Sequence, residues 1–255
     1  MADDVYPILE FDPSKEAMVE PSQVIKQHDV SEHCVICFFK EVIDEIVADK
    51  QAKIVVNNHW EDGPHPIFET IRDGRRLAFF HPGVGAALSA GLLEEVIAFG
   101  CRKFIVCGGC GVLEKSLGVG HLVVVTGAIR DEGVSYHYLP AGREVKANHL
   151  AITTLINLLM NRNLPFQVGK TWTTDAPYRE TQAKIAKRRE EGCLTVEMEA
   201  AALFAVAEFR SVILGQVLYS GDDLSGDHWD NREWQSRRGV RKNLFWLAAD
   251  ACLNL

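Results

Sequence analysis

The sequence predicts an α/β fold: a single-domain, three-layer sandwich with a mostly parallel, partly mixed central sheet flanked by helices. Apolar strands alternate along the chain with segments of helical periodicity, which is the pattern of such sheets. The chain has 255 residues, of which 47% are hydrophobic, and this suffices for one large core. No Pro-, Ser- or charge-rich linker divides it, so we treat residues 1–255 as one domain.

The first half of the chain contains a strand, a glycine turn, a helix and a second strand. Residues 75–81 form the first strand, and Gly83-Val84-Gly85 predicts the turn. Residues 86–99 follow helical spacing, and residues 103–107 form the next strand. The two strands of this unit should be parallel and joined by a right-handed crossover. Further strands are expected at residues 34–39 and 53–58.

The second half continues this alternation. Its expected strands are residues 121–129, 193–196 and 211–219, and its expected helices are residues 147–162, 179–191, 198–209 and 232–253. Sheets of this kind bind ligands at the carboxyl ends of their strands. Candidate functional residues should therefore follow directly after strands.

The composition excludes several classes of partner. The net charge is −8 with acidic and basic residues mixed, whereas a protein that grips nucleic acid usually shows a basic face. The first thirty residues are rich in Asp and Glu and lack the basic start and apolar run of a signal peptide. No apolar run approaches the roughly 20 residues that span a bilayer. We expect a cytoplasmic protein that binds neither nucleic acid nor membrane.

The seven cysteines are expected to be reduced thiols. Two C-x-x-C spacings, Cys34/Cys37 and Cys107/Cys110, are compatible with a four-thiolate zinc site. However, Cys34 and Cys37 lie in an apolar run typical of a buried strand, and Cys107 and Cys110 bracket a Gly-Gly pair expected to form a turn. Buried free thiols are the stronger interpretation, and we expect no metal.

Three segments that follow strands carry polar or glycine-rich chemistry. Gly108-Gly109-Cys110-Gly111 would let the backbone adopt positive φ and approach a ligand closely, or form a ligand-free turn. Glu197-Met198-Glu199 opens an Ala-rich helix, where a carboxylate either complements the helix dipole or binds two sugar hydroxyls. Asp222, after the strand at 211–219, is either a turn former or a general acid.

Together, residues 108–113, 128–140, 196–204 and 220–226 resemble the nucleoside phosphorylase family, which includes uridine phosphorylases, hexameric-type purine nucleoside phosphorylases and related nucleosidases. The resemblance covers roughly residues 6–250. It implies that Glu199 binds the ribose hydroxyls and that Asp222 is the catalytic acid that protonates the leaving base. The substrate-binding residues that it implies are Glu197, Met198, Glu199, Cys110, Gly111, Pro177, Tyr178 and Arg179.

The phosphate-binding residues depart from the family pattern. Lys15 stands where the family has an Arg, and Val106 replaces a second Arg. Gly109 replaces a Ser or Thr. The resemblance therefore leaves Lys15, Gly109 and Arg130 as candidates for the phosphate site. Because Lys cannot copy the bidentate grip of Arg, the nucleophile is left open between phosphate and water.

The leading functional interpretation is phosphorolysis of a nucleoside to free base and ribose 1-phosphate. It needs no metal or organic cofactor, because inorganic phosphate is the co-substrate. A nucleoside hydrolase and a non-catalytic nucleoside-binding protein are the alternatives. Asp222 favours a purine over uridine, although the Gln and Arg types that read uracil in relatives also occur in the loop at 179–183. The resemblance further implies a homodimer or a hexamer of dimers.

Overall fold

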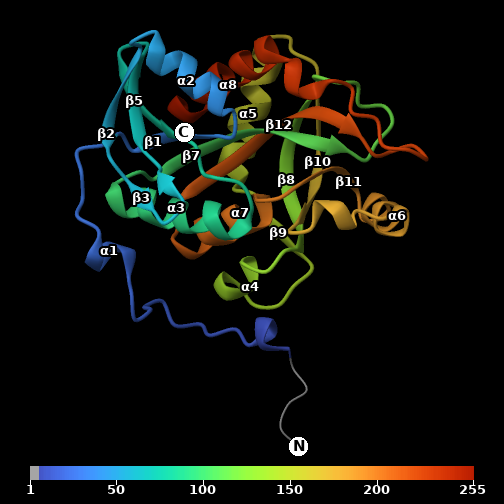
Figure 1. The fold of residues 1–255 in the computed structure, drawn as a ribbon, viewed down its shortest axis with the longest axis horizontal. Coiled ribbons are helices and arrows are strands. Elements are labelled where there is room, and N and C mark those ends of the chain that lie inside the picture. The colour runs from blue at the N-terminus through green and yellow to red at the C-terminus, as the bar shows by residue number, and fades with distance from the viewer. Residues whose placement is uncertain (1–5) are drawn as a thin grey trace, which may run out of the picture.

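A computed structural model of the protein describes residues 6–255 (Figure 1). Ten strands form one sheet and a short hairpin forms a second. The strands are β1 (His33–Cys37), β2 (Ala52–Val56), β3 (His59–Trp60), β4 (Gly63–Pro64), β5 (Ile67–Arg72), β6 (Arg75–Phe80), β7 (Lys103–Val112), β8 (Leu122–Asp131), β9 (Glu144–Lys146), β10 (Phe166–Thr174), β11 (Cys193–Glu197) and β12 (Ile213–Asp223).

Eight α-helices and three 3-10 turns accompany the strands in residues 6–255. The helices are α1 (Pro21–Val24), α2 (Lys40–Ala48), α3 (Ala86–Phe99), α4 (Ser135–Tyr138), α5 (His149–Asn161), α6 (Gln182–Glu190), α7 (Ala200–Phe209) and α8 (Arg238–Leu253). The 3-10 turns are η1 (Pro7–Leu9), η2 (Pro177–Arg179) and η3 (Trp234–Ser236).

The main sheet closes on itself over half of its width. Its strand order is β11-β10-β8-β12-β7-β1-β6-β5-β2, and β9 pairs with β8. β11 also pairs with β7 in the antiparallel direction, with Val196 opposite Gly111. The strands β11, β10, β8, β12 and β7 therefore form a closed ring, which has no free edge there.

Helices cover both faces of the sheet, which confirms the predicted α/β sandwich. One apolar cluster packs α2, α5 and α8 against the sheet through residues such as Ile43, Leu155 and Phe245. The other packs α3 and α7 through residues such as Leu93 and Phe204. Figure 1 shows the two sets of helices on opposite sides of the strands. Because each face of the sheet is covered, its central strands are mostly buried, including polar residues such as Gln216 in β12.

The glycine turn and the following helix agree with the sequence analysis. Gly83 and Gly85 adopt φ of 74° and 92°, and α3 begins directly after them and ends before Gly100 at φ 137°. β6 and β7 are parallel as expected, but β1 lies between them and pairs with both. The crossover therefore skips one strand.

The Gly108–Gly111 segment differs from the prediction. It is not a turn, because β7 continues through it, and none of its glycines has a positive φ. It pairs with β12 on one side, and Gly111 pairs with β11 on the other. The sequence analysis also missed the strands β3, β4, β5, β9 and β10 and the helices α1, α2 and α4. The antiparallel share is larger than in the predicted, mostly parallel sheet, because β2, β5, β9 and β11 each add antiparallel pairs and β8 and β12 pair antiparallel in the centre of the sheet.

The cysteines are buried and unpaired. All seven are free thiols, and Cys34 and Cys37 point into the two different apolar clusters, as expected of a buried strand. Residues 6–255 contain no group of three or more His, Cys, Asp or Glu side chains placed to hold a metal ion. Within the same residues, no helix is both long and apolar enough to cross a membrane.

Candidate active site

A cavity of about 340 Å³ opens where several strands of the sheet end. β7, β11 and β12 contribute about half of its lining residues. The others follow β1, β6, β10, β11 and β12 or belong to η3 and α8. Its lining includes eight residues expected from the sequence: Gly109, Cys110, Gly111, Pro177, Glu197, Met198, Glu199 and Asp222. The rule that ligands bind at strand ends therefore locates this cavity.

The β11–α7 junction places two carboxyl groups beside the cavity. β11 ends at Glu197, whose Oε2 accepts from the backbone N–H groups of Glu199 (2.7 Å) and Ala200 (2.6 Å). Its Oε1 accepts from the Thr173 hydroxyl at 2.6 Å. Glu197 therefore satisfies the free N–H groups at the start of α7, in the manner of a helix cap. Both of its oxygens are engaged within the protein.

Glu199 is the more available of the two carboxyl groups. It is buried, with 6% of its surface exposed, and its Oε1 accepts from the Gly85 N–H at 2.6 Å. Burial raises the pKa of Glu199, and the negative charge of Glu197 raises it further. No side-chain donor among residues 6–255 forms a hydrogen bond with it. The half-buried Met198 lies between the two glutamates and also lines the cavity.

The glycines of β7 bring the backbone close to neighbouring side chains. A Cβ on Gly111 would lie 2.5 Å from Leu224 Cδ1 and 2.9 Å from Val196 Cγ1. Glycine is therefore required here for close approach rather than for positive φ. Next to it, the Cys110 thiol donates to the Tyr219 carbonyl at 3.3 Å, and burial raises the pKa of this thiol. The raised pKa keeps the Cys110 thiol neutral, so this side chain forms an apolar part of the cavity lining.

Asp222 and Asp223 have different surroundings. The indole N–H of Trp229 donates to Asp222 Oδ2 at 2.7 Å, and Asp222 Oδ1 lies near Gly111. Asp223 instead pairs with Arg232 and accepts from the Ser225 N–H at 2.8 Å, and it is not among the residues that line the cavity. Asp222 therefore places its carboxyl group at the cavity, whereas the carboxyl group of Asp223 holds the loop that follows β12.

Glu180 is a cavity residue that the sequence analysis did not select. It follows the turn η2, and burial, then the negative charge of Asp222, raises the pKa of Glu180 to about 7. The loop that resembles the family ends at Arg179, one residue before Glu180. Extending that loop by one residue could therefore have identified Glu180 from the sequence.

Other lining residues also escaped the sequence analysis. Phe38 and Phe39 follow β1, but the predicted strand at 34–39 included them, so the strand-end rule did not identify them. Val84 lies in the predicted glycine turn after β6. Gln216 lies inside β12, and its buried Oε1 accepts no hydrogen bond from residues 6–255. Trp234 and Arg241 lie in or near α8, and no motif marked them.

Four residues expected at the site do not line the cavity. Tyr178 is 98% exposed, and Arg179 is exposed beside it. The Lys15 ammonium lies 3.9 Å from the centre of the Phe209 ring, in a second cavity of about 700 Å³ bounded by the N-terminal arm (residues 6–20), α3, α4 and α7. Their family-implied roles stay predictions.

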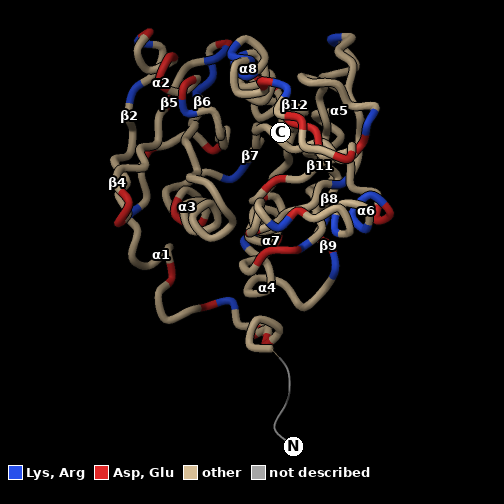
Figure 2. The backbone as a smooth tube through the Cα atoms, turned by 45° about the vertical axis from the view of Figure 1, so that its right-hand side comes forward, with Lys and Arg blue, Asp and Glu red and all other residues tan. Residues whose placement is uncertain are grey.

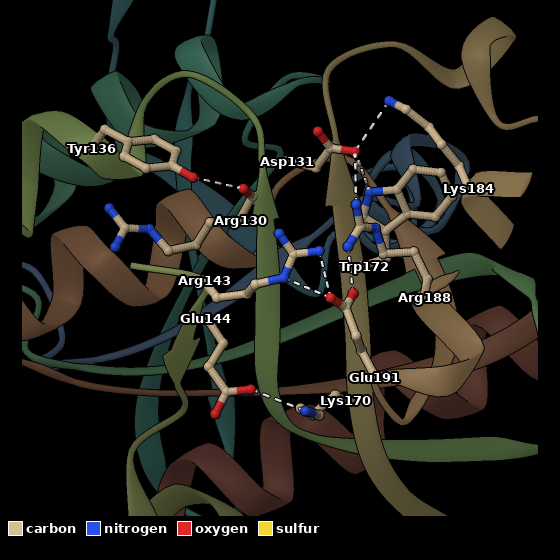
Figure 3. Close-up of polar contacts among 10 residues, drawn as sticks. All are labelled: Arg130, Asp131, Tyr136, Arg143, Glu144, Lys170, Trp172, Lys184, Arg188 and Glu191. Carbon is tan, nitrogen blue, oxygen red and sulfur yellow. Dashed lines mark hydrogen bonds and ion pairs between the residues drawn. The ribbon is translucent and has the colours of Figure 1, made fainter. Parts of the chain in front are cut away.

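The guanidinium of Arg130 is the fourth case. It donates to Ser135 Oγ at 2.8 Å and to the carbonyl oxygens of Pro140 (2.8 Å) and Leu139 (3.2 Å). It also stacks on Tyr136, beside which Figure 3 shows it. All of these partners belong to the loop around α4. Arg130 therefore fixes that loop in this chain.

The cavity is acidic. Four carboxyl residues line it (Glu180, Glu197, Glu199 and Asp222), and Arg241 is the one Lys or Arg in its lining among residues 6–255. Arg241 already pairs with Glu41 at 2.6 Å. Elsewhere, the positions of acidic and basic residues are interspersed along the chain (Figure 2). The site therefore suits a ligand that donates hydrogen bonds or develops positive charge.

Comparisons with known proteins agree with this geometry. The guanosine phosphorylase of Halorubrum lacusprofundi is 26% identical over 88% of this chain and 94% of its own length. A uridine phosphorylase from Vibrio fischeri superposes with a TM-score of 0.76 at 19% identity, over 92% of this chain and 98% of the other. An AMP nucleosidase from Bacteroides thetaiotaomicron superposes with a TM-score of 0.72 at 19% identity, over 89% of each chain.

The family prediction made from the motifs is confirmed by a match of most of the chain to a family model. The model of the Phosphorylase superfamily matches residues 32–244. This match includes β1 to β12 and the start of α8, and with them every strand that borders the cavity. The chain belongs to the phosphorylase superfamily.

Proposed function

We propose that the protein cleaves the N-glycosidic bond of a purine nucleoside by phosphorolysis, releasing the free base and ribose 1-phosphate. The observation that carries this proposal is the placement of Glu199 and Asp222 on two strand ends of one cavity. One carboxyl group suits the sugar and the other suits the base. The similarity to a guanosine phosphorylase over most of both chains supports the same reaction class.

Glu199 would act on the sugar. Glycosidic cleavage passes through an oxocarbenium-like state, in which hydrogen bonds to the neighbouring hydroxyls strengthen. The Gly85 N–H fixes one oxygen of Glu199. A ribose that donates its 2′ and 3′ hydroxyls to this carboxyl group would stabilise the ionised form despite burial. Met198 would pack against the sugar, and Glu197 would hold the start of α7 in place.

Asp222 would act on the base. A purine leaves more readily when N7 is protonated, and a positioned carboxyl group can supply that proton. Trp229 fixes Oδ2 of Asp222, while Oδ1 lies toward Gly111 at the cavity wall. Cys110, Gly111 and Pro177 would form the surface against the base.

Phosphate is the co-substrate in this proposal, and no metal or organic cofactor takes part. Gly109 lies on the cavity wall and would present its backbone to the phosphate. Lys15 and Arg130 would contribute only if the N-terminal arm or the α4 loop moved, or if a second copy of the chain supplied them. If Lys15 binds phosphate, Lys15→Ala should raise the KM for phosphate and leave the KM for nucleoside unchanged. An unchanged phosphate KM would remove Lys15 from the site.

We further propose a homo-oligomer with a dimer as its smallest unit. The segment from η1 to α1 runs along the outside of the body (Figure 2), and it exposes Met18, Val19 and Val24 at 100%, 70% and 67%. Clustered exposed apolar residues are typical of protein interfaces. Light scattering should give at least twice the chain mass. We also infer a cytoplasmic location, because all seven cysteines are free.

Hydrolysis is the second candidate reaction, and the acidic cavity favours it. A lining of four carboxyl groups with a single, already paired Arg repels an anionic nucleophile but tolerates water. The AMP nucleosidase shares the fold, so the fold alone does not select the nucleophile.

One experiment separates the two reactions and tests the proposed function. Base release from guanosine, inosine, adenosine and uridine is followed with and without inorganic phosphate, and the sugar product is identified. Phosphate-dependent release with ribose 1-phosphate as product supports the proposal. Release of free ribose at the same rate without phosphate makes the protein a hydrolase. If no base is released while nucleoside still binds, the protein is a non-catalytic binder.

A further inference from the structure

The Glu180 carboxyl group lies in the cavity without a protein partner. The chain turns at η2, and the Glu180 N–H donates to the Pro177 carbonyl at 3.3 Å, which directs the residue toward the cavity. Its carboxyl group is perturbed only by burial and by the charge of Asp222, and residues 6–255 supply no hydrogen bond or cation to it. A partly buried carboxyl group without donors is costly unless a ligand supplies them.

Three donors in or beside the cavity already have partners within the protein. The Cys110 thiol donates to Tyr219, and the Trp229 indole donates to Asp222. Arg241 is paired with Glu41. The carboxyl groups of Glu180 and Asp222 present acceptors to the cavity, and acceptors favour a base edge that donates.

Among the common nucleobases, guanine matches a carboxylate best. Its N1–H and its exocyclic amino group are adjacent donors, and they can bond to the two oxygens of one carboxylate. Hypoxanthine offers only N1–H on that edge. Adenine presents an acceptor at N1, and uracil flanks its one N–H with two carbonyl groups, so each would leave buried acceptors facing each other.

We propose that Glu180 reads the N1–H and amino edge of guanine and thereby makes guanosine the preferred nucleoside. This inference rests on the proposed function, because it assigns a base to the same cavity. Asp222 then serves the opposite, N7 edge of the ring. Both carboxyl groups line the same cavity of about 340 Å³, and no hydrogen bond joins them.

The test varies the protein and the substrate together, in the manner of a double-mutant cycle. Wild type, Glu180→Gln and the control Glu190→Gln are compared by kcat/KM on guanosine and inosine, which differ only in the amino group. Glu190 is exposed on α6, ten residues along, and does not line the cavity. Wild type and the control should prefer guanosine by about 10- to 150-fold, the span of a hydrogen bond to a charged group. In Glu180→Gln this preference should fall to within about threefold.

Adenosine provides an independent readout. An amide can donate to adenine N1 and accept from its amino group, so Glu180→Gln should narrow the gap between adenosine and guanosine while circular dichroism shows an unchanged fold. If wild type cleaves nucleosides but prefers adenosine or uridine, or if Glu180→Gln keeps the full guanosine-to-inosine ratio, the assignment of Glu180 is wrong and the proposed function stands. If wild type cleaves no nucleoside, the proposed function itself fails, and the assignment of Glu180 fails with it.

Discussion

Glu199→Gln tests the proposed chemistry of the sugar directly. The substitution keeps the volume and an oxygen that can accept from the Gly85 N–H, so it removes mainly the negative charge. A hydrogen bond to a charged group contributes about 1.5–3 kcal/mol and a neutral one about 0.5–1.5 kcal/mol. Each sugar hydroxyl should therefore lose about 1–1.5 kcal/mol. For two hydroxyls the loss is about 2–3 kcal/mol, or about 30- to 150-fold in kcat/KM.

The loss should appear mainly in kcat. The hydroxyl contacts tighten as positive charge develops on the sugar, so the substitution weakens the transition state more than the ground state. The assay is steady-state base release from guanosine and from 2′-deoxyguanosine, with kcat and KM determined separately. Removal of the 2′ hydroxyl should cost wild type more than it costs Glu199→Gln, because the variant has already lost the charged acceptor.

The control is Glu208→Gln, an exposed residue on the same helix α7, which should retain wild-type kinetics. Unfolding in urea should show that Glu199→Gln is not less stable than wild type, because burial of Glu199 penalises its charged form. A change confined to KM, or an equal penalty on the ribo and deoxy substrates, would refute the role of Glu199.

Three further predictions address the base, the close approach of strands and pH. Asp222→Asn should lower turnover about 10²–10⁴-fold and Asp223→Asn much less, since Asp223 holds Arg232 outside the cavity; near-normal turnover by Asp222→Asn contradicts the acid role. Gly111→Ala should cost about 1–3 kcal/mol of unfolding free energy by overpacking against Leu224 and Val196, whereas the open Gly226→Ala should cost far less in the same urea titration. Burial raises the pKa of Asp250, but hydrogen bonds from Arg72 and Arg162 outweigh it and leave that pKa below its usual value. Its ionised form therefore stabilises the fold above the unfolded pKa of about 3.9, and the stability gap between wild type and Asp250→Asn should close as pH falls below that value. A gap that persists at pH 2 would contradict this.

The sequence predicted the elements whose signal is local. α3 is bounded by two glycines with positive φ, and its start and end agree with the expected residues 86–99. β10 was missed because its residues include Lys170 and three threonines as well as apolar residues, so no clear period appears. α2 was missed because nine residues are too few for a clear helical repeat.

The glycine segment at 108–111 shows why local signals fail at the site. Glycine is compatible with a turn and with a strand, and only its partners decide between them. Here β12 and β11 flank the segment, more than eighty residues away in the chain, and they keep it extended. The same reason applies to Glu180: the loop at 179–183 contains it, but only the fold places its carboxyl group in one cavity with Asp222.

Some cavity residues lie on or next to strands of the closed ring, and others lie on loops outside it. The ring strands are β11, β10, β8, β12 and β7. Glu197 ends one ring strand and Asp222 lies near the end of another, so main-chain ladders hold the chemical groups in register. Glu180 lies on a loop between β10 and α6, outside that ladder. Substitutions in the loop can therefore change which base is accepted without shifting the reacting groups. If Glu180 reads the base as proposed, exchange of this short segment alone should alter base preference while the strands of the ring keep their positions.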